Sequence, residues 1–195
     1  DMTGLAQKGG EVLSHVRLAA DRDELRTGHI ISGGTDLLLA CDIVSAVGKG
    51  AFETLNPERS RAVGNTDNTP VADFVINNKM DFHQEQIKKT LHDATKEQHF
   101  VPATHYALAL MGDEIATNIF MMGYAWQKGL IPLSRASIER AIELNEVAIA
   151  ANKRSFNFGR LAAHDPAKIE ALAKSVTGGV EEERIAETLH ERIER

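Results

Sequence analysis

Two polar stretches of this sequence carry residue types that could contact a ligand. The first, residues 3–10, contains Thr3, Gln7, Lys8 and the pair Gly9-Gly10. Glycines let the backbone approach another surface closely, Gln7 can both donate and accept hydrogen bonds, and the compact positive charge of Lys8 suits a carboxylate or a phosphate. A glycine pair before a strand can equally do no more than turn the chain, with the lysine solvated, and both interpretations stay open.

The second polar stretch, residues 66–70, follows a run that predicts a β-strand over residues 61–65. Ligands usually bind at the carboxyl ends of the strands in open α/β sheets. Asn65 and Thr66 are therefore candidates for a ligand-binding edge. The sequence Thr-Asp-Asn-Thr-Pro at 66–70 is also ordinary turn chemistry, and that alternative remains.

The sequence lacks the familiar patterns of a self-contained active site. Its eight histidines form no H-E-x-x-H motif, and Cys41, the one cysteine, has no companion for a zinc or iron–sulfur site. Residues 112–114 begin like a thiamine diphosphate motif, but the third glycine is missing, and the paired asparagines Asn77-Asn78 lie upstream instead of downstream. We expect no catalytic residue, no metal site and no cofactor on this chain.

The composition is that of a soluble globular protein. The chain has 195 residues, 43% of them apolar, a mean hydropathy of -0.24 and a formal net charge of -6. Because the basic residues are scattered, we expect no nucleic-acid partner. No apolar run is long enough to span a bilayer and no leader pattern is present, so we expect no membrane association and a cytoplasmic location. The start at Asp1, without an initiator methionine, indicates part of something longer.

Runs of apolar residues between turn residues predict the secondary structure. Leu37 to Cys41, bounded by Gly33-Gly34 and Asp42, is typical of a strand buried on both faces of a parallel sheet. The predicted strands cover residues 12–19, 37–41, 61–65 and 99–103. The predicted helices cover residues 43–55, 82–98, 114–129, 134–160 and 181–195, and Asp165-Pro166 opens a further short helix. Asp42, Asp113 and Ser134 are the expected caps at the starts of the first, third and fourth of these helices. This alternation predicts an α/β fold, a layered α/β/α domain with a largely parallel sheet and a helical C-terminal third.

The predicted helix 114–129 is the most apolar of these elements. It carries the only tryptophan, Trp126, and its flank adds Phe120, Met121 and Tyr124. A helix that is apolar around much of its girth needs more than one surface to pack against, so we expect these three side chains to contact a partner chain in an oligomer. An ordinary core helix without a partner is the alternative.

Several ordered segments together resemble one known family. They are TGLAQKGGEVLSHVR (3–17), GGTDLLLACDIV (33–44), RAVGNTDNTP (61–70), ATNIFMMGYAWQKGLIPLS (116–134) and NKRSFNFGR (152–160). Residues 1–163 resemble the gamma-type domain of 2-oxoacid:ferredoxin oxidoreductases and are most similar to indolepyruvate ferredoxin oxidoreductase. Residues 164–195, a predicted helical tail, carry no such likeness.

The resemblance implies an enzyme that oxidatively decarboxylates an aryl 2-oxoacid with coenzyme A and passes two electrons to ferredoxin. It places thiamine diphosphate and the iron–sulfur clusters in partner domains or subunits, and it makes coenzyme A a candidate ligand of residues 3–10. The family's domain normally opens with a strand, a Gly-rich loop and a helix that this sequence lacks. Ser155 stands where the family often has alanine. A free-standing α/β nucleotide-binding or dimerisation module is the alternative function.

Overall fold

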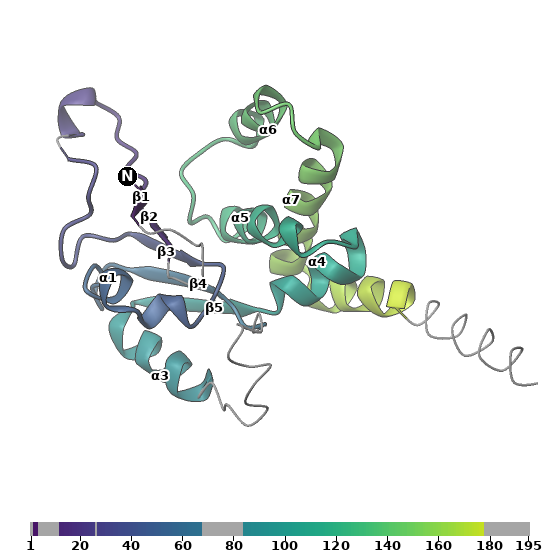
Figure 1. Ribbon diagram of the computed structural model, residues 1–195, viewed down its shortest axis with the longest axis horizontal. Helices are drawn as coiled ribbons and strands as arrows, with labels where there is room; N and C mark the ends of the chain where they lie inside the picture. Colours follow the sequence, from purple (N-terminus) through teal and green to yellow (C-terminus); the bar gives the residue numbers. More distant parts are fainter. Residues whose placement is uncertain (1, 4–11, 26, 68–83, 178–195) are drawn as a thin grey trace, which may run out of the picture. The chain divides into compact units, whose positions relative to one another are not determined.

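The computed structural model describes residues 2–3, 12–25, 27–67 and 84–177 (Figure 1). The chain divides into two compact units, Asp1–Val101 and Pro102–Arg195, called unit 1 and unit 2 below. The division falls inside the expected domain 1–163, and residues 164–177 belong to unit 2. The predicted terminal helix 181–195 lies outside the described residues.

Unit 1 is built on a parallel sheet whose described strands are β3 (Leu37–Ala40), β4 (Arg61–Asn65) and β5 (Glu97–Val101), in the order β3-β4-β5. The predicted strands 37–41 and 61–65 are confirmed within one residue. The third begins two residues before the predicted start of 99. Together with the helices of unit 2, this sheet confirms the predicted α/β class with a helical C-terminal part.

One face of the sheet packs on short helices that follow β3 and on α3 (Gln84–Ala94). Ile43 and Leu91 are fully buried in this core, and Phe100 of β5 packs against it. The Phe100 ring lies over Gly64 of β4, where an added Cβ would come within 3.1 Å of it. The glycine in the central strand therefore makes room for an aromatic ring from its neighbour.

The helix predicted over residues 43–55 is replaced by two short turns, the 3-10 helix η3 (Ser45–Val47) and α1 (Lys49–Phe52). Gly48 separates them in an extended conformation, with ψ of 145°. Glycine is a poor helix former because it loses the most backbone entropy. The prediction of one continuous helix here is wrong.

The predicted strand 12–19 is realised only at β2 (Leu13–Ser14), which pairs with β1 (Met2–Thr3) in an antiparallel sheet of its own. Beyond Ser14, side-chain hydrogen bonds hold the segment in place of backbone strand pairing. The His15 Nδ1 atom accepts a hydrogen bond from the Ile30 amide at 2.9 Å, and Arg17 donates to Thr27. This segment is thus extended but not part of the parallel sheet. A 3-10 turn, η2 (Arg22–Glu24), follows it.

Unit 2 is helical among its described residues. Its elements are α4 (Ala103–Met111), the 3-10 turn η4 (Glu114–Ala116), α5 (Thr117–Gln127), α6 (Arg135–Leu144), α7 (Ile149–His164) and a helix over residues 166–177. Helix α4 was not predicted as a separate element, although its last residues belong to the same long apolar stretch as α5. It ends at Gly112, which adopts a left-handed conformation.

The predicted helix 114–129 corresponds to η4 and α5, which follow one another. Asp113 caps the start, as expected, by accepting a hydrogen bond from the Ile115 amide at 2.9 Å. The predicted helix 134–160 begins correctly with Ser134 as its cap, but it is two helices. The chain breaks between α6 and α7, where Glu146 and Ala148 have positive φ angles. Asp165 caps the next helix by accepting from the Lys168 amide.

Helices α5 and α7 cross at backbone contact distance. A Cβ added to Gly123 of α5 would lie 2.1 Å from the Phe156 carbonyl oxygen, and a Cβ added to Gly159 of α7 would lie 1.9 Å from that of Phe120. Both distances are far below any real contact. The two glycines therefore set how closely these helices pack, and larger side chains around them fill the rest of the contact.

A buried hydroxyl adds a polar bond to the same contact. Ser155 of α7 is fully buried, and its Oγ donates to the Ala116 carbonyl at 2.7 Å, at the junction of η4 and α5. Ser155 therefore fixes the start of α5 against α7.

Replacing Gly159 with alanine should destabilise unit 2 strongly. The methyl group would force the helices apart, which costs about 3 kcal/mol by analogy with overpacked cores. Gly112→Ala is the matched control, because its left-handed backbone is strained by a side chain but nothing lies within 4 Å of the added Cβ. It should cost about 1 kcal/mol. Urea unfolding followed by circular dichroism measures both, and equal losses would contradict the crossing.

Replacing Ser155 with alanine should cost about 1 kcal/mol of unfolding free energy, because the Ala116 carbonyl loses a buried donor. Ser175→Ala is the control, since that hydroxyl is exposed and bonds within its own helix. The control should stay within about 0.5 kcal/mol of the wild type. Identical denaturation midpoints for both variants would show that the buried bond contributes nothing.

Candidate functional site

The carboxyl ends of the three parallel strands form the edge at which we expected a ligand. Asn65, the last residue of β4, is 1% exposed. Its Nδ2 donates to the Cys41 carbonyl at 3.0 Å, and its Oδ1 accepts from the Asp67 amide at 3.2 Å. The side chain thus links the end of β3 to the turn after β4. Both of its polar atoms already serve the backbone, which favours a structural role.

Thr66 continues the same edge through its backbone. Its amide donates to the Val101 carbonyl at 3.0 Å, and its own carbonyl accepts from the Gln84 side chain at 3.0 Å. Gln84 is the first residue of α3, so this bond ties the start of that helix to the edge. Nothing in the sequence pattern singled out Gln84. Its role depends on which residues the fold brings together.

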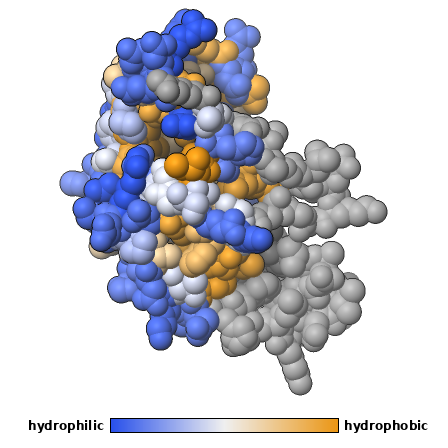
Figure 2. All heavy atoms as spheres, turned by 90° about the vertical axis from the view of Figure 1, so that its left-hand side faces the viewer, coloured by the Kyte–Doolittle hydropathy of each residue, from blue (hydrophilic) through white to orange (hydrophobic). Residues whose placement is uncertain are grey.

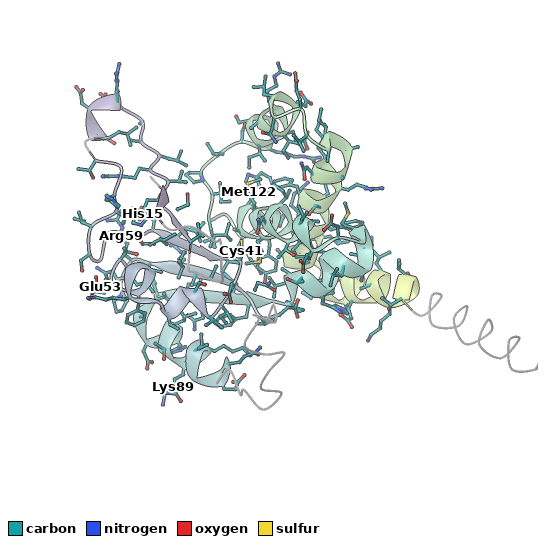
Figure 3. The ribbon with its side chains drawn as sticks, in the orientation of Figure 1. His15, Cys41, Glu53, Arg59, Lys89 and Met122 are labelled. Carbon is teal, nitrogen blue, oxygen red and sulfur yellow. The ribbon has the colours of Figure 1, made fainter. Side chains whose placement is uncertain are left out.

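Cys41 and Asp42 follow β3 at this edge (Figure 3). Burial raises the pKa of the Cys41 thiol, and the nearby Asp42 carboxylate raises it further. The thiol is therefore protonated at neutral pH and is a poor nucleophile. Asp42 accepts hydrogen bonds from the Val44 amide and the Ser45 hydroxyl, so it caps the turn as the sequence predicted.

The polar stretch at residues 3–10 is mostly outside the described residues. Thr3 lies in β1 and pairs with Leu13 of β2. The predicted site residues Gln7, Lys8, Gly9 and Gly10 are not described, so their contact with a ligand stays a prediction.

Phe120, Met121 and Tyr124 are buried, with exposed fractions of 1%, 0% and 8%. The Phe120 ring stacks on Tyr106 at 5.9 Å, and burial raises the pKa of the Tyr124 hydroxyl. These side chains therefore belong to the core of the described structure. The predicted partner contact through them lacks support, because packing within the chain already covers the flank of α5.

Iron–sulfur clusters do not fit this chain. A cluster needs about four thiolates, whereas the sequence has a single cysteine. Within the described ranges, no three His, Cys, Asp or Glu side chains are placed to bind a metal ion. In the same ranges, no helix has the length and apolar character needed to cross a membrane.

The edge offers amide, carboxylate and backbone groups that could position a neighbouring surface, but it brings no nucleophile and base together among the described residues. The side chains of Asp42, Asn65 and Gln84 at this edge form hydrogen bonds with backbone groups of the same chain. The sequence correctly placed Asn65 and Thr66 at the edge. It could not show that the Asn65 side chain is already hydrogen-bonded to the Cys41 carbonyl and the Asp67 amide.

Comparison with known proteins agrees with the resemblance of the ordered motifs. No curated protein and no solved structure matches the chain significantly. The family model described as pyruvate ferredoxin/flavodoxin oxidoreductase matches residues 1–162, which include the whole described part of unit 1 and helices α4 to α6. The chain therefore belongs to the pyruvate ferredoxin/flavodoxin oxidoreductase family.

Proposed function

We propose that this chain is a gamma-type, non-cofactor-bearing domain of a thiamine diphosphate-dependent 2-oxoacid:ferredoxin oxidoreductase. The family match over residues 1–162 carries the proposal. The complete enzyme would convert a 2-oxoacid and coenzyme A into an acyl-CoA and carbon dioxide, with two electrons passed to ferredoxin. The motifs most similar to indolepyruvate ferredoxin oxidoreductase favour an aryl 2-oxoacid such as indolepyruvate.

The chemistry of this chain supports placing the cofactors on partner domains or subunits. Its single cysteine cannot supply the roughly four thiolates of a cluster, and Asn65 at the sheet edge is committed to backbone groups. When bound to its own domain, thiamine diphosphate supplies the stabilised carbanion needed for decarboxylation. This chain would shape or close the site from outside, in an oligomeric enzyme.

The purified chain should contain no stoichiometric iron and should not reduce ferredoxin or a dye in the presence of indolepyruvate and coenzyme A. The same assay should succeed when the polypeptides that carry the thiamine and cluster domains are co-expressed with it. Iron analysis and anaerobic dye reduction measure these outcomes. Iron and activity in the isolated chain would overturn the proposal.

A thermal-shift screen separates this function from a free-standing nucleotide-binding module. A ligand that binds only the native state stabilises it by RT ln(1 + [L]/Kd). A strong shift with NAD or a flavin, and none with coenzyme A, would favour the nucleotide-binding module.

Within the proposed enzyme, we place residues 3–10 close to the chemistry, with Lys8 facing a carboxylate or a phosphate of coenzyme A. Support comes from the residue types: the glycine pair, the amide of Gln7 and the compact charge of Lys8.

Lys8→Ala in the complete enzyme should lower kcat/KM about tenfold, or about 1.4 kcal/mol of transition-state stabilisation, with an unchanged melting temperature. Lys89→Ala is the control, because Lys89 is exposed on α3 (Figure 3). The Lys89→Ala control should leave both kcat and KM unchanged. If the Lys8 variant also keeps its turnover and its Michaelis constants for oxoacid and coenzyme A, the stretch is structural.

A further inference from the structure

Arg160 of α7 is held in a fixed orientation by three neutral groups. Its guanidinium lies over the Trp126 ring, 5.0 Å from the centroid. Its Nε donates to the Gln127 side chain at 3.1 Å, and its Nη1 donates to the Asn157 side chain at 3.0 Å. The two amides and the indole orient the guanidinium without neutralising its charge.

Four other arginines of the described ranges form ion pairs with carboxylates: Arg59 with Asp36, Arg61 with Glu97, Arg135 with Glu139 and Arg140 with Glu143. Arg17 instead donates to the Thr27 carbonyl and hydroxyl, and the exposed Arg154 makes no hydrogen bond or ion pair there. Arg160 has no carboxylate within ion-pair distance among the described residues. A guanidinium that is already oriented and has no carboxylate partner can bind one with little further ordering cost.

The hydrogen bonds of Arg160 also leave part of its fork unused. Guanidinium has five N–H donors, and the described contacts use one on Nε and one on Nη1. Three N–H donors remain, two on Nη2 and one on Nη1. Adjacent guanidinium N–H groups can bind both oxygens of one carboxylate.

The side chains next to Arg160 have the composition of an interface centre. Trp126 is half-buried, and its indole N–H donates to the Leu133 carbonyl at 2.8 Å. Leu133 itself is 43% exposed. Tryptophan and arginine are the residue types most enriched among the residues that dominate binding energy at protein interfaces. Other apolar side chains also remain at the surface among hydrophilic ones, as Figure 2 shows for one face.

We propose that Arg160, Trp126 and Leu133 form a docking surface for another polypeptide of the oxidoreductase, which presents an Asp or Glu carboxylate to the Arg160 fork. The inference rests on the proposed function, because it requires such a partner. It relocates the partner contact of α5 from the buried Phe120, Met121 and Tyr124 to the carboxyl end of the same helix.

A carboxylate on a macromolecule suits this site better than a small free anion. A single partly exposed ion pair contributes about 0.2–1 kcal/mol, which cannot retain a small ligand at ordinary concentrations. In a protein interface, the apolar contacts of Trp126 and Leu133 would hold the partner, and the fork would fix its register. The orientation cost of the guanidinium is already met by Trp126, Gln127 and Asn157.

The test compares Arg160→Gln and Arg160→Lys with Arg154→Gln in the complete enzyme. Arg154 is the control because it is exposed on the same helix and makes no hydrogen bond or ion pair in the described structure. Sedimentation at increasing salt measures assembly, and amide hydrogen exchange over residues 126–134 reports whether the surface is covered. In an assembled interface the pair would be desolvated, and truncating one partner there costs more than a partly exposed pair contributes. Arg160→Gln should therefore weaken assembly at least tenfold and increase exchange there, and Arg154→Gln should change assembly less than twofold.

Arg160→Lys retains the charge but not the fork, so its assembly should fall between those of the wild type and Arg160→Gln. It also decides the question if circular dichroism shows that Arg160→Gln is misfolded. Wild-type assembly by both folded Arg160 variants would overturn the inference while leaving the proposed function intact. Failure of the wild-type chain to assemble with any polypeptide of the enzyme would instead overturn the proposed function and, with it, this inference.

Two other ligands of this surface, a small anion or a second copy of the chain, can be tested on the isolated chain. Trp126 is its only tryptophan, so tryptophan fluorescence reports on this surface alone. Titration with sodium acetate or inorganic phosphate at constant ionic strength should leave its fluorescence unchanged. A saturable change that is lost in Arg160→Gln would show a small-anion site and overturn the assignment to a protein carboxylate. Self-association that depends on Arg160 would overturn the assignment to a different polypeptide.

Discussion

The close crossing of α5 and α7 is the constraint on which the organisation of unit 2 depends. At Gly123 and Gly159, the backbone of each helix lies where a side chain of the other would be. Because the helices approach so closely, the large residues beside the glycines, such as Phe120 and Phe156, become fully buried. Dispersion attraction increases steeply as atoms approach. The two glycines, which lack side chains, therefore determine how well the whole helix contact packs.

The crossing also explains why α5 does not need a partner along its flank. A helix that is apolar around its girth must be covered, but a neighbour at backbone contact distance covers more of its circumference than one at ordinary spacing. Met121 is fully buried as a result. At the carboxyl end of α5, the half-buried Trp126 and Arg160 lie beside the exposed Leu133, which differs from a bare apolar flank.

The sequence predicted the elements whose signal is local. The apolar run Leu37 to Cys41 and the caps Asp113 and Ser134 are correct because their physical causes lie within a few residues. The helix over 43–55 failed at Gly48, where one extended residue outweighs an otherwise helical pattern. The break between α6 and α7 was missed because Glu146 and Ala148 do not ordinarily favour positive φ.

The sequence could predict where the candidate site lies, but not whether its polar atoms are already hydrogen-bonded within the chain. Asn65 and Thr66 follow a strand, so sheet topology alone places them at the carboxyl edge. Whether their polar atoms are available depends on Cys41, Asp67 and Gln84, which come from other parts of the chain. Arg160 was likewise predictable only in position. It lies in the family-like segment 152–160, but its lack of a carboxylate partner is a property of the tertiary structure.

The polar groups of the two units differ in whether the chain itself satisfies them. At the sheet edge of unit 1, Asn65 and Asp42 bond to nearby groups of the chain, which stabilises the edge and lowers its capacity to hold a cofactor. In unit 2, Arg160 is oriented by amides that leave its charge uncompensated. Under the proposed function, other polypeptides would position this chain through that oriented charge. In a multidomain oxidoreductase, the chemistry would then depend on how precisely such contacts place the domains, because small displacements of reacting groups reduce rates severely.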